Sequence, residues 1–80
     1  MKTLARAVLI ASGFLELSDD SVVDPDSALT TLESIAAELQ EATPDERDAL
    51  KRAAEQMAEE SSGEAKTFFK SFMKSAGLDE

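Results

Sequence analysis

Apolar residues recur along the chain at intervals of three and four, and nowhere do they alternate with polar residues as they would in a strand. This spacing places apolar side chains along one face of a helix. Four helical segments are expected, at about residues 3–17, 25–42, 44–61 and 64–76. The pattern predicts an all-α fold, a compact bundle of four short helices that forms a single domain over residues 1–80.

The apolar stripe of each segment predicts the core of this bundle. The residues expected to face inward are, segment by segment, Leu4, Ala7, Val8, Ala11, Phe14 and Leu15; Ala28, Leu32, Ile35, Leu39 and Ala42; Leu50, Ala53, Ala54 and Met57; and Ala65, Phe68, Phe69, Phe72 and Ala76. Val22 and Val23, between the first two segments, are also expected to point inward. The third segment is the least hydrophobic of the four, so its neighbours can approach closely but gain little buried area.

Polar residues and prolines predict where the helices begin and end. Asp24–Pro25 and Thr43–Pro44 are both helix starts, because the first side chain can accept hydrogen bonds from free amides and proline lacks the donor that would be left unpaired. Thr43 and Glu46 have the spacing of a reciprocal capping box. Gly77 suits the left-handed turn that commonly ends a helix.

The amino-acid composition argues against catalysis. The chain has no cysteine and no histidine, which excludes disulfides, thiolate and imidazole metal ligands, cysteine nucleophiles and histidine bases. Paired carboxylates need an apolar pocket to raise one pKa, and a core this small leaves little space for one. Lys66, Lys70 and Lys74 lie along one flank of a helix, where lysines are usually solvated. We therefore expect no enzyme, no catalytic residue and no cofactor.

A cluster of aspartates between the first two segments is a candidate cation site. Asp19, Asp20, Asp24 and Asp26 could collect oxygen ligands around calcium. Their spacing does not match the calcium loop of a helix-loop-helix hand, which needs acids at alternate positions, a central glycine and a terminal glutamate. Turn and cap roles explain the same residues. No metal site is expected.

The net charge of −9, from 17 acidic and 8 basic residues, excludes two classes of partner. It repels nucleic-acid phosphates and anionic membranes, so we expect no direct nucleic-acid binding and no membrane binding. No apolar run approaches the length of about 20 residues that a membrane span needs. The short apolar stretch after Lys2 and Arg6 lacks a cleavage site and soon meets Glu16, so no signal peptide is expected. Because the chain has no cysteine, its composition does not indicate an oxidising or a reducing compartment. We expect the cytoplasm.

The acidic residues are unevenly distributed. No basic residue lies within residues 7–46, which hold ten of the acidic residues. Solubility alone explains a negative charge, but an acidic face without cations also attracts a basic protein. Our hypothesis is a soluble, non-catalytic protein-binding module, for example an inhibitor or immunity-type protein that blocks a basic enzyme such as a nuclease. The predicted partner-binding residues are Asp19, Asp20, Asp24, Asp26, Glu33, Glu38 and Glu41.

A structural homodimer is a second hypothesis. Leu9, Ile10 and Leu17 fall outside the predicted stripe of the first segment and would form an apolar surface patch. A symmetric dimer would bury this patch on both copies. The competing explanation is that the fourth segment folds across the back of the first and covers the patch within one chain.

A third hypothesis comes from Asp26 and Ser27, at the start of the second segment. In size, charge, helix count and this Asp–Ser pair the chain resembles an acyl carrier protein. The resemblance implies that Ser27 carries phosphopantetheine and that the acidic second helix docks basic partner enzymes. The chain departs from that family at Ala28, where leucine is usual, in a shorter loop before the second helix, and in a longer third helix. Ser27 is also explained as an ordinary polar residue in the first turn of a helix.

Overall fold

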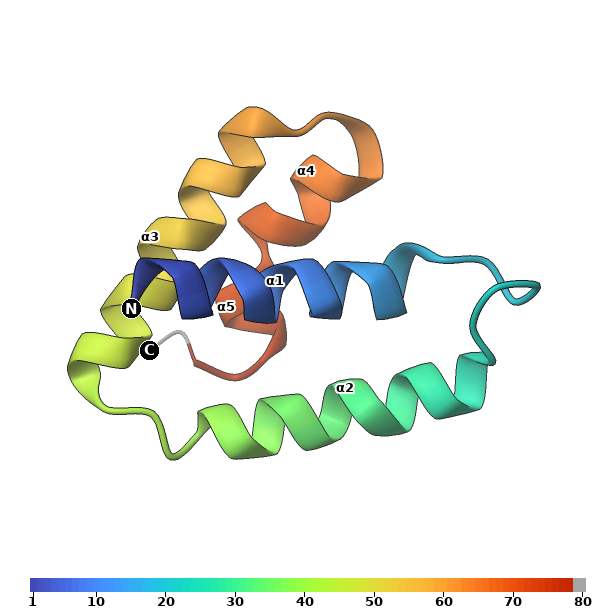
Figure 1. Cartoon of the computed structure of the whole chain (residues 1–80), viewed down its shortest axis with the longest axis horizontal. Coiled ribbons are helices and arrows are strands. Elements are labelled where there is room, and N and C mark those ends of the chain that lie inside the picture. Colours follow the sequence, from blue (N-terminus) through green and yellow to red (C-terminus); the bar gives the residue numbers. More distant parts are fainter. Residues whose placement is uncertain (79–80) are drawn as a thin grey trace.

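The computed structural model describes residues 1–78, which form five helices and no strand (Figure 1). The helices are α1 (Lys2–Leu17), α2 (Pro25–Leu39), α3 (Pro44–Glu60), α4 (Gly63–Lys70) and α5 (Phe72–Ser75). They pack into a body of 36 × 27 × 22 Å. The predicted all-α bundle is confirmed, with its fourth helix divided into two.

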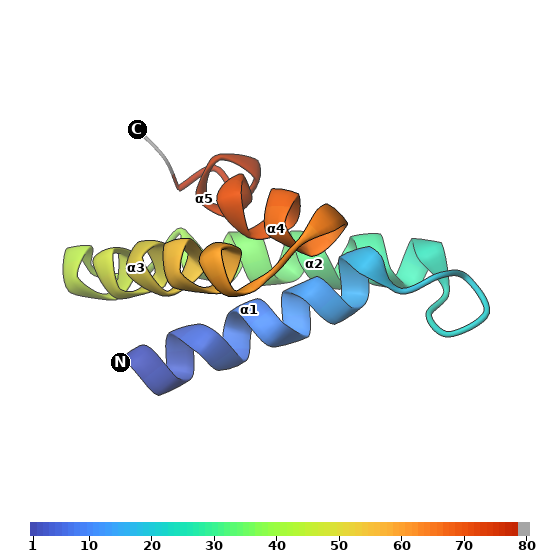
Figure 2. The ribbon, with the colours of Figure 1, turned by 90° about the horizontal axis from the view of Figure 1, so that it is seen from above.

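Helix α1 packs against α2 along one flank and against α3 and α4 along the other, and its remaining side is open (Figure 1). Figure 2 shows that α1 also forms one margin of the molecule. Among the described helices, the backbone of α2 comes close only to that of α1. Helices α3 and α4 form a hairpin, and α5 closes against its open end. The molecule therefore has a dense half around α3 and a looser half around α2.

Helix α3 supplies the largest share of the core. Its buried residues are Leu50, Ala53, Ala54, Met57 and Ala58. The alanines let α1 and α4 approach closely, and side chains from those helices then fill the centre. Leu9, Phe69 and Phe72 meet this face of α3. The predicted inner stripe of α3 is confirmed.

The predicted inner stripe of α1 is wrong. The buried residues are Ala5, Leu9, Ser12 and Gly13, whereas Leu4 is 72% exposed and Phe14 is 55% exposed. The physical reason is that α1 is apolar nearly all round, so its periodicity does not distinguish one face from another. The buried face is the one that holds the small residues Ala5, Ser12 and Gly13, and the Phe69 ring lies 3.6 Å from where a Cβ atom of Gly13 would be.

Two further predictions about apolar residues need correction. Leu9, expected on a dimer patch, is 0% exposed because α3 and α4 cover it within the chain. Val22, expected to point inward, is 62% exposed because it lies in a turn that projects from the bundle. The competing explanation, in which the fourth segment covers part of the first, holds for Leu9. Ile10 and Leu17 remain exposed.

The predicted helix starts are confirmed. The Asp24 carboxylate accepts a hydrogen bond from the Ser27 amide at 2.9 Å. Thr43 and Glu46 form both bonds of the capping box, at 3.1 and 2.8 Å. Helix α2 ends at Leu39 rather than near residue 42, because residues 40–42 tighten into turns. The Arg47 side chain donates to the Gln40 carbonyl there, at 2.8 Å.

The C-terminal region differs from the single helix predicted for residues 64–76. The chain turns at Ser71, whose hydroxyl donates to the Thr67 carbonyl at 3.0 Å, and α5 follows in a new direction. Gly77 has a φ of 75°, so the left-handed stop is confirmed. This turn returns Leu78 to the core, a position that periodicity did not predict. The Gln40 side chain donates to the Ala76 carbonyl at 3.0 Å and ties this turn to the end of α2.

Candidate protein-binding surface

All seven sequence-predicted partner-binding residues, Asp19, Asp20, Asp24, Asp26, Glu33, Glu38 and Glu41, are exposed. They follow the 18–24 turn and α2, along the looser half of the molecule (Figure 1). The ion pairs within residues 1–78 are Arg6–Glu60 and Arg52–Asp48, and neither includes any of the seven. This acidic surface, defined by the seven residues, thus carries its charge without a cation from the described chain.

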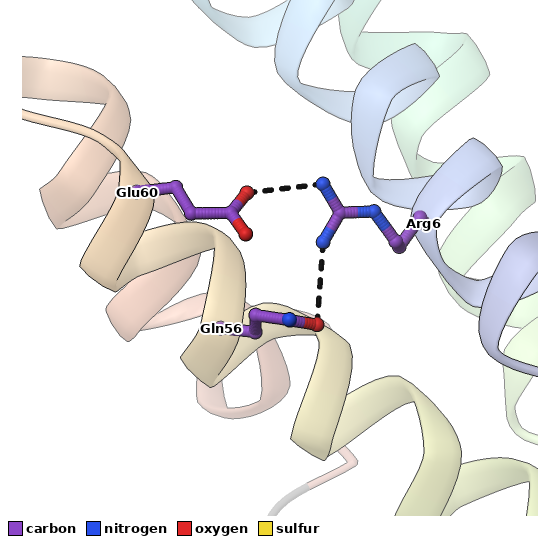
Figure 3. Close-up of polar contacts among 3 residues, drawn as sticks. All are labelled: Arg6, Gln56 and Glu60. Carbon is purple, nitrogen blue, oxygen red and sulfur yellow. Dashed lines mark hydrogen bonds and ion pairs between the residues drawn. The ribbon is translucent and has the colours of Figure 1, made fainter.

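Arg6, by contrast, pairs with side chains of α3 and not with the acidic surface. Its guanidinium Nη2 lies 3.0 Å from Glu60 Oε1, and its Nη1 donates to Gln56 Oε1 at 3.3 Å (Figure 3). Both bonds join α1 to α3 in the dense half of the molecule. The pair is partly exposed, so its contribution to the free energy of unfolding is at most about 1 kcal/mol.

Two carboxylates of the acidic surface also organise the local backbone. Asp19 accepts a hydrogen bond from the Ser21 hydroxyl and another from the Ser21 amide, and together these lower the pKa of Asp19. The Ser27 amide donates to Asp24, which lowers the pKa of Asp24. Hydrogen bonds to the charged form cause both shifts. The two side chains therefore form a turn and a helix cap while still contributing negative charge.

A cleft of about 210 Å³ lies between α2, the C-terminal half of α1 and the α4–α5 region. Its walls are apolar, with Leu32 of α2 facing Phe68 and Phe72. Glu16 and Glu33 line the same cleft, which we name the C-side cleft. Ser12 also lines it, and its buried hydroxyl has no hydrogen-bond partner among the described residues. The cleft therefore combines apolar walls with two carboxylates, while Ser12 is 0% exposed and lies beneath its surface.

A second cleft, of about 310 Å³, lies on the other side of α2, where the start of α1 and the start of α3 meet its last turn. Val8 and Leu39 are among its apolar residues. Glu38, Glu41 and Glu46 also line this cleft, which we name the N-side cleft. As in the C-side cleft, no lysine or arginine of the described chain lines it.

The two clefts add residues that the sequence did not assign to the site. Glu16 and Glu46 belong to the acidic run of residues 7–46, which was the available signal. They were not assigned because only the acidic loop before the second helix and that helix itself were expected to form the binding face. Glu33, Glu38 and Glu41 are brought together with apolar walls, whereas Asp19, Asp20, Asp24 and Asp26 line neither cleft.

The basic residues gather elsewhere. Arg47, Lys51, Lys70 and Lys74, four of the eight in the chain, line an open groove of about 940 Å³ between α3 and the α4–α5 region. Lys66, Lys70 and Lys74 are exposed. Asp48 and Glu55 line the same groove, so α3 and the α4–α5 region carry both signs of charge, whereas no lysine or arginine lines the two clefts beside α2.

The remaining candidate chemistry is limited within the described residues. No group of three or more acidic side chains in residues 1–78 is placed to hold a metal ion. Ser27 is exposed in the first turn of α2, beside its cap Asp24. None of the described helices is long and apolar enough to cross a membrane. No protein-family model, curated protein or solved structure matches this chain.

Proposed function

We propose that the protein is a non-catalytic protein-binding module that docks a basic partner through the acidic surface and the two clefts beside α2. The observation that carries the proposal is the composition of the clefts. Five carboxylates line them, from Glu16, Glu33, Glu38, Glu41 and Glu46, together with apolar walls and without any lysine or arginine of the described chain.

Such clefts suit the side chains of lysine and arginine. Both residues have an apolar stem and a charged end, and they bury the stem along apolar surface while the charge stays hydrated or paired. A stem beside Leu32 and Phe68 would place its charge near Glu33.

The carboxylates outside the clefts contribute at longer range. An acidic surface on a protein of net charge −9 steers a basic protein toward it and raises the association rate by an order of magnitude or more at low salt. Asp19, Asp20, Asp24 and Asp26 supply this field, and the clefts supply the fixed contacts. In its most concrete form the module is an inhibitor or immunity-type protein whose carboxylates take the place of phosphates in the groove of a basic enzyme.

A carrier function on Ser27 is the alternative, favoured by the exposure of this serine at the start of an acidic helix. It makes a separate prediction, the mass of phosphopantetheine on Ser27 in protein isolated from its source cell. An intact mass equal to that of the unmodified chain would contradict it.

The binding proposal is tested with a defined probe, an amphipathic helical peptide of lysine and leucine, and with its counterpart in which glutamate replaces lysine. Backbone NMR shifts should move around the two clefts with the lysine peptide, and the affinity should fall as salt rises. The glutamate peptide should not bind. The two peptides have the same apolar residues, so binding of both would show that charge does not select the partner.

Charge-reversal variants locate the site. Glu33→Lys with Glu41→Lys should keep the fold but weaken binding at least tenfold, because both side chains are exposed and line the clefts. Glu55→Lys with Glu59→Lys changes the net charge equally on exposed positions of α3, and should bind nearly as the original protein does. Equal weakening by the two pairs would overturn the site. The same proteins, used as baits in source-cell lysate at low and high salt, then identify the natural partner.

A further inference from the structure

The outward side of α1 is covered by apolar residues that no part of the described chain buries. We name this set the outer stripe; its members are Leu4, Ala7, Ile10, Ala11, Phe14 and Leu17. Ile10 is 60% exposed and Phe14 is 55% exposed. No charged residue lies between Arg6 and Glu16. Figure 2 shows α1 along the margin of the molecule, with no other described element outside it.

The outer stripe is larger than an incidental patch. It follows α1 from Leu4 to Leu17, a length of about 20 Å. The opposite side of the same helix already faces the core through Ala5 and Leu9. A helix that is apolar on both sides is typical of one with neighbours on both sides, and a contiguous apolar patch on a charged protein marks an interaction site.

The spacing within the stripe fits another helix. Ala7, Ile10, Phe14 and Leu17 follow one another at intervals of three, four and three, which is the seam of a coiled coil. The stripe is also complementary to itself when two copies run antiparallel about an axis between Ile10 and Ala11. Leu4 then faces Leu17, Ala7 faces Phe14, and Ile10 faces Ala11.

Two of these three pairs set a large side chain against an alanine, the arrangement that lets facing layers interdigitate. In a parallel pair each residue would instead face its own copy, so that Phe14 would meet Phe14 and Ala7 would meet Ala7. The antiparallel arrangement therefore fills the seam more evenly.

The charges at the ends of α1 favour the same direction. Lys2 lies at its start, and Asp19 and Asp20 follow its end. An antiparallel pair brings the basic start of one helix near the acidic turn of the other, whereas a parallel pair would bring like charges together. Two proteins of charge −9 repel each other least through a surface that carries no charge, and the outer stripe is such a surface.

We propose that the occupant of the outer stripe is a second copy of this chain, bound antiparallel about a two-fold axis that passes between Ile10 and Ala11. The interface is isologous, as in most homodimers. Ile10 and Leu17, predicted from the sequence, belong to it, and Leu9 does not. The inference does not require a basic partner and is tested without one, and Asp19 and Asp20 belong both to the acidic surface and to the ends of this interface.

Light scattering on a size-exclusion column measures the mass of the full chain up to high micromolar concentration. The expected mass is twice 8.6 kDa. Phe14→Glu should reduce it to 8.6 kDa, while the helical circular dichroism signal is kept. Val22→Glu is the matched control, because Val22 is equally exposed but lies in the 18–24 turn. A monomer at every concentration, or dissociation by both variants, would overturn the proposal.

Single cysteines test the direction of pairing in a chain that has none of its own. Disulfides require Cα atoms within about 7 Å. Leu4→Cys alone should not cross-link, because antiparallel helices separate the two copies of residue 4 by about 20 Å along the axis. A mixture of Leu4→Cys and Leu17→Cys chains should form the mixed disulfide. Cross-linking of Leu4→Cys to itself, without the mixed product, would show a parallel pair and overturn the proposed axis.

Discussion

Helices α2 and α3 are similar in length but contribute unequally to the core. Of the 17 residues of α3 five are buried, and of the 15 residues of α2 only Ala28 is buried. Yet α2 is the more hydrophobic helix, and Leu29, on its surface, is 59% exposed. The difference lies in the neighbours: the backbone of α3 comes close to α1, α4 and α5, whereas among the described helices the backbone of α2 comes close to α1 alone.

This contrast shows that the position of a helix among its neighbours decides burial more than its hydrophobicity does. The alanines of α3 add little apolar area each, but they allow three helices to meet closely. The larger residues of α2 meet α3 and the α4–α5 region only across the two clefts. A loosely covered helix of this kind has apolar surface available for a partner, which the densely packed α3 does not.

Truncation of one leucine in each half should have unequal effects on stability. Leu9→Ala should lower the free energy of unfolding by about 2–5 kcal/mol, because the side chain is fully buried against α3. Leu32→Ala, on half-buried α2, should lower it by about 1 kcal/mol. Urea unfolding followed by circular dichroism measures both. Equal losses would mean that α2 is packed as tightly as α3.

The Thr43 cap at the start of α3 should make a smaller contribution to the free energy of unfolding than the buried leucine of α1. Thr43→Ala removes the side-chain oxygen that accepts from the Glu46 amide and should cost about 1 kcal/mol. Thr43→Ser keeps an oxygen at this position and should retain most of the stability. Thermal unfolding compares the three proteins. An alanine variant as stable as the serine variant would argue that the cap contributes nothing.

Gly13 allows a gain in stability at the contact between α1 and α4. A Cβ atom there would lie 3.6 Å from Phe69 Cζ and 3.7 Å from Phe68 Cε2, which are ordinary contact distances. Gly13→Ala should therefore raise stability by about 0.5–1 kcal/mol through helix propensity. Gly13→Leu should lower it instead, since the larger side chain would displace the rings. A destabilised alanine variant would show that this contact is tighter than described.

Acid should weaken the start of α2 through Asp24. Hydrogen bonds from Ser27 lower the pKa of Asp24 in the folded protein, so its contribution is present above the unfolded pKa of about 3.9 and is lost as the pH falls through the folded value. Asp24→Asn keeps a good cap that does not titrate. It should lose less stability than the original protein between pH 5 and pH 2 in thermal melts. Asp26→Asn, which removes a neighbouring carboxylate but not the cap, should behave like the original protein.

The elements that the sequence predicted correctly are those set by local chemistry. The caps at Asp24 and Thr43 depend on residues within one turn, and the stripe of α3 is marked by charged residues on its other sides. The face of α1 could not be predicted in the same way, because an apolar residue stands at almost every position from Ala7 to Leu15. Which side faces the core depends on where α3 and α4 find small residues.

The candidate site could likewise be predicted from the sequence only where local pattern determines it. Exposure of the seven carboxylates followed from charge and periodicity. The clefts did not, because they arise where α2 meets residues distant in the chain, such as Leu50 of α3 and Phe68 of α4. The break at Ser71 depends on a hydroxyl bonded to the preceding turn, an arrangement that an apolar spacing of three and four residues does not reveal.

The late position of Phe69, Phe72 and Leu78 in the chain has a consequence for biosynthesis. These residues complete the core around Leu9, and the Gln40 bond to Ala76 joins segments 36 residues apart. A nascent chain on the ribosome therefore cannot complete the core around Leu9 until the α4–α5 region has left the exit tunnel. Until then the growing polypeptide presents to chaperones and proteases more of the apolar surface of α1 than the finished protein does.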